Sequence, residues 1–298
     1  MTLRKIFTCA LLSCVLAACG TTPKPGPQAS YPTVRVYVQH PQNLGMLPLR
    51  VAERLGFFSQ QHINVDWVST PNDAPLRVEN AGVHYPIDGL VMEKPDLLLV
   101  SPLPDPHFRL YSLNHLPMVY ARSEAAWVPY LKAVLVQHHV IPTTLTALGI
   151  SQIKEHWQQN TLPWVVVSLT EYYQLRHVVP HTTILAFLGA ATGPIPVTVI
   201  TGVNKNALAF VSAINLALWY LYTTKPDVIA SLLSPSTPTT GRILAQALHY
   251  HYWPNTVVIT QSLYQRGQSL FGTAKSWPSY ATSVNVKLAQ AALTHWPA

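Results

Sequence analysis

The stretch LPLRVAERLGFF at residues 47–58, together with INVDWV at residues 63–68, has the pattern of a helix that leads into a strand. Apolar residues recur at helical spacing as far as Phe58, and the charged residues fall largely on the other side. Gly56 allows the end of the helix to tighten, so that a phenylalanine can pack under a sheet. We therefore expect a helix over residues 47–61, followed by the strand.

Strands and helices alternate along most of the remaining sequence. Apolar or alternating runs predict strands over residues 34–38, 96–100, 118–121, 133–137, 164–168, 182–187 and 196–201. Helical spacing predicts helices over residues 143–159, 205–223, 226–233, 240–252, 260–271 and 280–294. This order favours an α/β fold with mainly parallel sheets flanked by helices. The apolar segment 207–222 is too short for a good membrane span, so we expect a buried core helix there.

The N-terminus has the pattern of a lipoprotein signal peptide. Arg4 and Lys5 precede the apolar run at residues 6–15, and LAAC follows at residues 16–19. A Leu, two small residues and a Cys form the lipobox pattern, in which the Cys thiol accepts a diacylglyceryl group. We expect residues 1–18 to be removed and Cys19 to be lipidated. The alternative is an ordinary secretory signal with a Cys there by chance.

Residues 19–30 contain Pro23, Pro25 and Pro27 and no large apolar residue, which favours an extended, solvated tether. Each buried methylene of a lipid on Cys19 contributes about 0.8 kcal/mol to membrane binding. The sequence therefore predicts a body anchored to a membrane of the cell envelope and facing the periplasm or the exterior.

Composition excludes several classes of site. Cys9 and Cys14 lie in the signal peptide, so the mature chain has no pair of cysteines for a disulfide and no cluster for a metal. The net charge of +7 is not concentrated in any basic run, so we expect no nucleic-acid partner. Charged residues make up 10% of the chain, against about a quarter in ordinary proteins. One hypothesis is adaptation to an acidic exterior, where carboxylates lose charge and histidines gain it.

Five segments resemble one protein family in content and order. They are residues 47–68, SLTE at 168–171, GPIPVTV at 193–199, the Ala-rich stretch 206–219 with its Trp, and KPDVIA at 225–230. In this respect the chain resembles the substrate-binding proteins of ABC importers for nitrate, sulfonates, taurine and thiamine-precursor pyrimidines. The resemblance extends over roughly residues 34–295.

The resemblance implies a two-lobed periplasmic-binding-protein fold of type II. The first lobe would hold residues 31–122 and 199–298, and the second would hold residues 123–198. A ligand would lie in the cleft between the lobes, at strand carboxyl ends and helix N-termini, which is also where open α/β sheets generally bind ligands.

Polar residues at such positions are the candidates for ligand contacts. They are Gln42, Asn43, Gly45, Ser69, Asn72, Ser101, Thr143, Thr144, Glu171 and Tyr172. For the turn and cap residues, a purely structural role remains the alternative. Glu171 beside two tyrosines suits an amine, an amidine or an aminopyrimidine, through charge-assisted hydrogen bonds and stacking. The alternative for Glu171 is an ordinary surface carboxylate on a helix.

Catalytic and metal motifs are missing from the sequence. There is no Gly-x-Ser-x-Gly elbow, P-loop, His-Glu-x-x-His or Gly-x-Gly-x-x-Gly. His138–His139, His177 with His181, and His249 with His251 lack supporting carboxylates or a suitable helical spacing. We therefore expect neither an enzyme nor a metal or other cofactor.

The leading functional hypothesis is capture of a small solute outside the membrane and its delivery to an ABC permease by a monomeric lipoprotein. Residues 72–96 and 140–144 depart from the family pattern at places that usually contact ligand. A degenerate fold that senses a solute or binds another envelope protein is therefore the alternative. A secreted hydrolase without a recognisable motif is a third possibility, which the sequence favours less.

Overall fold

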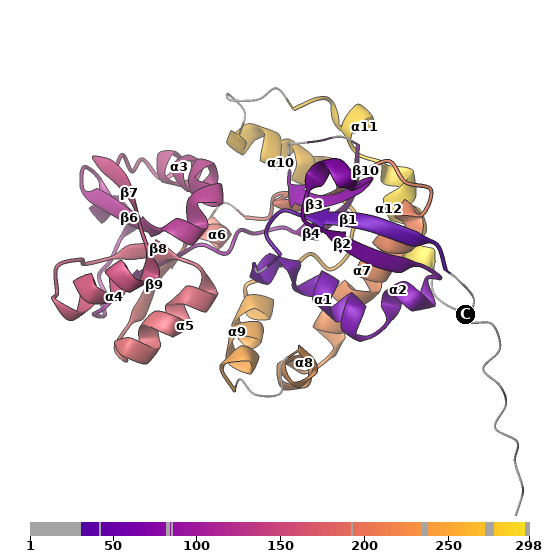
Figure 1. Ribbon diagram of the computed structural model, residues 1–298. Coiled ribbons are helices and arrows are strands. Elements are labelled where there is room, and N and C mark those ends of the chain that lie inside the picture. The colour runs from indigo at the N-terminus through magenta and orange to yellow at the C-terminus, as the bar shows by residue number, and fades with distance from the viewer. Residues whose placement is uncertain are drawn as a thin grey trace, which may run out of the picture. The chain divides into compact units, whose positions relative to one another are not determined.

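Two mixed sheets of five strands, each flanked by helices, form the body of the protein in the computed structural model (Figure 1). The structure describes residues 31–41, 43–81, 84, 86–191, 193–233, 238–271 and 277–295. Residues 31–298 form one unit. The predicted signal peptide, Cys19, the tether and Gln42 lie outside the described residues.

The first sheet has the strand order β2-β1-β3-β10-β4. Its strands are β1 Thr33–Val38, β2 Asn64–Val68, β3 Leu76–Asn80, β4 Ile87–Met92 and β10 Thr198–Gly202. β1 runs parallel to β2 and β3, whereas β10 runs antiparallel to β3 and β4. Every residue of β4 is buried, so this edge strand is covered on both faces.

The second sheet has the strand order β7-β6-β8-β5-β9. Its strands are β5 Leu98–Ser101, β6 Pro117–Ala121, β7 Thr144–Leu148, β8 Val165–Val167 and β9 Thr183–Phe187. β6 runs parallel to β7 and β8, but β5 runs antiparallel to β8 and β9. The start of β5 therefore lies beside the end of β8, with Leu98 paired to Val167.

Helices cover both sheets. On the first sheet these are α1 Leu47–Arg54, α2 Phe57–Gln60, α7 Ala207–Thr223, α8 Pro226–Leu233, α9 Pro238–His249, α10 Gln261–Phe271, α11 Tyr280–Ser283 and α12 Val286–Thr294. On the second they are α3 Val128–Gln137, α4 Ile150–Gln158, α5 Leu169–Val178 and α6 Leu188–Ala191. α7 is the central helix of the first core and contacts α1, α2 and α12, as expected for a buried helix. Among the described residues, no helix is long and apolar enough to cross a membrane.

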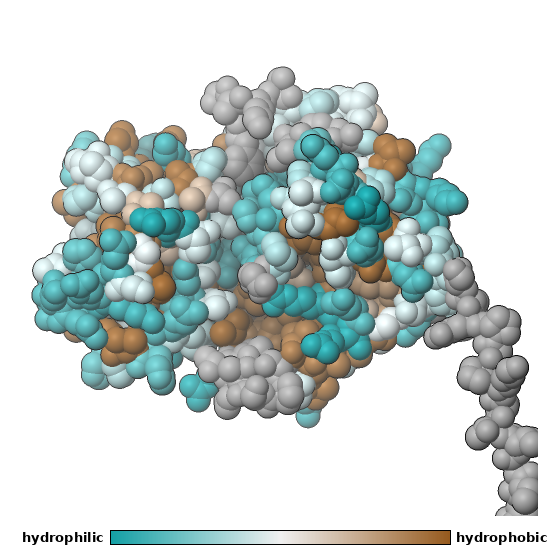
Figure 2. Space-filling view, in the orientation of Figure 1, coloured by the Kyte–Doolittle hydropathy of each residue, from teal (hydrophilic) through white to brown (hydrophobic). Residues whose placement is uncertain are grey.

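The face shown in Figure 2 carries hydrophobic residues in separate patches among hydrophilic ones. Large exposed apolar side chains include Leu103, Val136, Ile141 and Val203. Given the low content of charged residues, uncharged polar groups supply much of the hydrophilic surface.

Several predicted elements are wrong in type. Residues 133–137 are the end of helix α3 and not a strand, because their buried neighbours Leu131, Val134 and Leu135 follow helical spacing. Residues 143–159 are not one helix. The alternating sequence TLTAL forms β7, and α4 begins only after Gly149.

Two further differences concern continuity and topology. The expected helix 47–61 is divided at Gly56, whose φ of 69° ends α1 before α2 begins. β3 and β4 form within residues 72–96, where the sequence pattern predicted no strand. The sheets are mixed rather than mainly parallel, because β5 and β10 each run against two neighbours.

The passage between the sheets also differs from the prediction. The chain leaves the first sheet after Met92 and enters the second at Leu98, whereas the sequence placed this crossover near Arg122. An apolar run such as residues 97–100 fits the interior of either sheet, so the pattern alone does not assign it. If each lobe contains one sheet, β5 and β6 belong to the second lobe. The chain returns to the first sheet at Thr198, where β10 begins.

Candidate functional site

A cavity of about 390 Å³ lies at the carboxyl ends of β1, β6 and β8. From the first sheet it is lined by Gln39, His40, Pro41, Asn43 and Leu44. From the second sheet it is lined by Asp96, Ser123, Glu124, Trp127, Ser168, Thr170 and Glu171. This volume is in the usual range for small-molecule sites, about 300–1,000 Å³.

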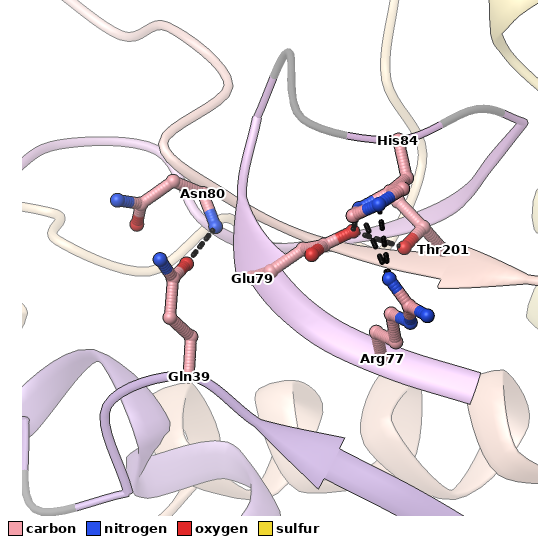
Figure 3. Close-up of polar contacts among 6 residues, drawn as sticks. All are labelled: Gln39, Arg77, Glu79, Asn80, His84 and Thr201. Atoms are coloured by element: carbon pink, nitrogen blue, oxygen red, sulfur yellow. Dashed lines mark hydrogen bonds and ion pairs between the residues drawn. The ribbon is translucent and has the colours of Figure 1, made fainter. Parts of the chain in front are cut away.

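The wall that follows β1 is fixed by hydrogen bonds within the first sheet. The Gln39 side chain accepts from the Asn80 backbone N–H at 3.0 Å, which holds it against the end of β3 (Figure 3). Asn43 Oδ1 accepts from the Gly45 N–H at 2.8 Å and caps the short turn that leads into α1. Gly45 is buried, and a Cβ there would collide with the Met92 sulfur. These residues therefore form a rigid wall.

A buried carboxylate beside this wall has partners within the first sheet. Glu79 on β3 is only 3% exposed, and its Oε1 accepts from the Thr201 hydroxyl at 2.6 Å (Figure 3). The same oxygen lies 2.8 Å from His84 Nδ1, while Arg77 donates to His84 Nε2 at 2.9 Å. With Nε2 accepting, Nδ1 carries the proton that is donated to Glu79.

On the opposite wall, Glu171 is anchored by the N-terminus of α5. Its Oε2 accepts from the Ser168 N–H at 3.1 Å, and Ser168 Oγ accepts from the Glu171 N–H at 3.3 Å. This reciprocal pair is a capping box, and the S-x-x-E spacing of residues 168–171 produces it. The Ser123 hydroxyl donates to the other oxygen, Oε1. Glu171 is therefore held in one orientation at the cavity wall.

Asp96 is buried beneath the same helix end. It is 1% exposed, and its Oδ1 accepts from the Leu169 N–H at 2.8 Å. The buried Tyr252 hydroxyl lies close enough to interact with it, although not with the geometry of a full hydrogen bond. Burial raises the pKa of Asp96 to about 7, outweighing these donors, and the neighbouring Glu171 adds to the rise.

Glu124 is the third carboxyl group of the cavity. It lies in the 3-10 helix Arg122–Trp127 that follows β6, and it is 5% exposed. Its Oε2 is buried without a hydrogen-bond partner, whereas both oxygens of Glu171 accept hydrogen bonds. Burial raises the pKa of Glu124 well above its usual range, and the charges of Asp96 and Glu171 raise it further. Strongly perturbed carboxyls in a cavity are a common mark of a functional site.

Basic side chains do not balance these carboxyls. No Lys or Arg is among the described residues that line the cavity. His40 does line it, with Nε2 buried and unpartnered, and burial lowers the pKa of the imidazole, which favours the neutral form. Arg50 donates to the Pro41 carbonyl and lines a separate groove beside α1. The cavity is therefore acidic or, where the carboxyls are protonated, neutral.

Known structures share this architecture. The zinc-bound ligand-binding component of an ABC-type import system from Staphylococcus aureus has a TM-score of 0.63 and 10% identity, covering 88% of this chain and 99% of that one. The periplasmic aliphatic sulphonate-binding protein of Escherichia coli has a TM-score of 0.61 and 14% identity, covering 82% of this chain and 91% of that one. A Candida albicans gene product with the generic periplasmic binding protein fold scores 0.54 at 10% identity, covering 88% and 95%.

The chain has the periplasmic binding protein fold. The fold expectation from the sequence is thereby confirmed, although the sheets are mixed. No family model and no curated protein matches the sequence. Among the described residues, no group of three or more His, Cys, Asp or Glu is arranged to hold a metal ion.

Two of the expected contact residues, Asn43 and Glu171, line the cavity of this binding-protein fold. Gly45 lies directly behind Asn43, packed against Met92. Tyr172 is not among the lining residues; it is buried in the core, where its ring centroid lies 5.1 Å from that of Tyr173, edge-on.

The other expected residues lie away from the cavity. Ser69 and Asn72 are exposed after β2. Ser101 ends β5, and because β5 is antiparallel to β8, its carboxyl end lies at the opposite edge of the sheet. Thr143 and Thr144 cap no helix. Thr144 begins β7, parallel to β6, and so lies at that same far edge.

Asp96, Glu124 and Trp127 are cavity residues that the sequence patterns did not single out. Asp96 was assigned to the expected strand 96–100, but it precedes β5 and points to the cavity edge because β5 runs antiparallel. Glu124 follows β6 directly, at a carboxyl end, and this position is the signal by which it could have been found.

Proposed function

We propose that this chain is an extracytoplasmic solute-binding lipoprotein that captures a small molecule in the cavity and delivers it to an ABC permease. The observation that carries the proposal is the cavity itself, since loops from both sheets line it. The binding proteins of import systems among the structural neighbours support it. Such a protein makes and breaks no bonds, so no catalytic residue is required.

Two short connections link the sheets and suit a closing motion. They are residues 93–97, between β4 and β5, and residues 188–197, between β9 and β10. They are hydrogen-bonded to each other, from the Ile195 N–H to the Glu93 carbonyl at 2.9 Å and from the Gly189 N–H to the Leu97 carbonyl at 3.1 Å. A ligand that contacts both walls favours the closed arrangement by its differential affinity for it.

Solute capture is tested by small-angle X-ray scattering of the full chain with and without candidate solutes. We expect a bound solute to reduce the radius of gyration and to raise the melting temperature. A solute at a concentration about 100 times its dissociation constant adds about 2.7 kcal/mol to the free energy of unfolding. A cooperatively folded protein that no solute compacts would instead favour the degenerate interaction module.

Membrane attachment is proposed to depend on lipid at Cys19, after removal of residues 1–18, with residues 19–30 as a tether for a monomeric body. We expect Cys19→Ala to abolish incorporation of labelled palmitate and to move the protein from the membrane fraction to the soluble fraction. Cys9→Ala, within the signal peptide, is the matched control and should leave both unchanged. Palmitate labelling that persists in Cys19→Ala would contradict this.

A further inference from the structure

We infer that the cavity binds a small organic cation, an amine or an amidine, whose N–H groups donate to the carboxyl groups of Asp96, Glu124 and Glu171. This inference rests on the proposed solute-binding function and names its ligand class. Three features of the cavity carry it: an unpartnered acceptor, an occupied helix N-terminus and, among the described residues, the lack of a carboxyl arrangement that could hold a metal ion.

The unpartnered acceptor is Glu124 Oε2. The side chain is 5% exposed and lines the cavity, yet this oxygen accepts no hydrogen bond from the protein. A buried polar atom without a partner is costly and uncommon, and Oε1 of Glu79, a carboxylate buried to the same degree in the first sheet, has two partners. A ligand N–H in the cavity supplies the donor that Glu124 lacks.

The N-terminus of α5 disfavours an anion. The first amides of a helix are an effective anion site, but here protein carboxylates already accept from them. The Ser168 N–H donates to Glu171, and the Leu169 N–H donates to Asp96. With no Lys or Arg among the described lining residues, an anionic ligand would meet three carboxyls and no cation.

The arrangement of the carboxyls disfavours a bare metal ion. Among the described residues, no three carboxyl or imidazole groups converge closely enough to coordinate one. The three carboxyls are instead distributed around a cavity of about 390 Å³, which suits donors several ångströms apart on one ligand. Trp127 lines the same cavity, and an indole ring also attracts an organic cation.

Binding of a cation should also displace protons. The titratable groups that face Asp96 and Glu124 are Glu171 from α5, Tyr252 after α9 and His40 after β1. Burial raises the pKa of both carboxyls, that of Asp96 to about 7, and a ligand cation favours their ionised forms. The affinity for the cation should therefore increase as the pH rises.

The test is isothermal titration calorimetry on the full chain with benzamidine, benzamide and benzoate, which share one ring and differ in charge, and with 1,5-diaminopentane. We expect benzamidine or the diamine to bind, benzoate not to bind, and binding to release protons into buffers of different ionisation enthalpy. Glu124→Gln should lower the affinity for the cation by about 30-fold, which is the loss typical when a buried charged partner is removed. Glu155→Gln, an exposed carboxylate on α4, removes the same charge and should leave the affinity unchanged.

Other outcomes separate this inference from the proposed function. Compaction by benzoate or benzamide, without binding of either cation, would overturn the cationic ligand class and leave solute binding intact. Cation affinity that is equal in Glu124→Gln and in the parent chain would also overturn it. If none of the four probes binds, the inference fails, and the scattering experiment then decides whether solute capture fails with it.

Discussion

At the residue scale, the three cavity carboxyls differ in how the protein holds them. Glu171 is a helix cap as well as a cavity residue, and Asp96 supports the same cap from below. Glu124 interacts with the Ser123 hydroxyl, but its Oε2 accepts no hydrogen bond from the protein. A carboxyl group that is buried at a cost to folding is expected where a ligand needs it.

Glu124→Gln is therefore expected to stabilise the unliganded protein. The raised pKa of Glu124 means that the folded state disfavours ionisation, while the unfolded chain ionises freely above about pH 4.5. At neutral pH the change should therefore increase the free energy of unfolding. The increase should vanish near pH 4, where Glu124 is protonated in both states. Denaturant unfolding at the two pH values checks this, and equal or lower stability at neutral pH would contradict it.

At the scale of elements, the contact between the two connections depends on one glycine. Gly189 in α6 lies against the Pro95 carbonyl so closely that a Cβ would overlap it. Both partners are backbone, so neither can move aside without separating the connections. This packing fixes how residues 188–197 cross residues 93–97.

Gly189→Ala is expected to destabilise the protein by about 3 kcal/mol or more, as overpacking against backbone does. Gly149→Ala is the control, because a Cβ there would meet only the flexible Gln152 side chain, at 3.5 Å, and its φ of −71° suits alanine. Thermal unfolding of both variants is the measurement. A Gly189→Ala melting temperature close to that of Gly149→Ala would show that the connections can separate freely.

Local sequence patterns predict some elements of this fold and not others. The helix and strand at residues 47–68 and the S-x-x-E cap at residues 168–171 follow from local patterns, and the structure has them. The direction of β5 does not follow from a local pattern, because an apolar run has the same sequence pattern whether its strand runs parallel or antiparallel to its neighbours. That direction alone moves Ser101 away from the cavity and Asp96 to it. Burial of Glu124 likewise depends on contacts distant in sequence.

At the scale of the whole molecule, buried carboxyls should shift the stability optimum to acidic pH. Burial raises the pKa of Asp88 to about 6 and those of Glu93 and Asp96 to about 7. A carboxyl group whose pKa is raised in the folded state makes its full contribution to the free energy of unfolding below its unfolded-state pKa of about 4. This contribution is lost as the pH rises towards 7. His40 acts in the opposite direction, because its lowered pKa favours folding at higher pH.

The carboxyls outnumber this histidine, so we expect the free energy of unfolding to be about 1–3 kcal/mol higher at pH 5 than at pH 8. Urea unfolding across this range is the measurement. Asp88→Asn should remove part of the dependence, since the Asp88 carboxyl is buried and accepts from Asn285 at 2.9 Å. A profile with its maximum at neutral pH would count against both this prediction and the hypothesis of an acidic habitat.

The position of Asp96 links the charge of the cavity to the flexibility of the connection between the two sheets. This carboxyl belongs to the connection at residues 93–97, so the segment that would flex in the proposed closure also contributes to the cavity wall. A ligand that ionises Asp96 adds a charge within this connection itself, rather than acting on it from a distance. Ligand binding and the flexibility of residues 93–97 would then depend on the same short segment of backbone. In the proposed function, a permease that distinguishes the open from the closed arrangement would therefore also respond to the charge of the solute.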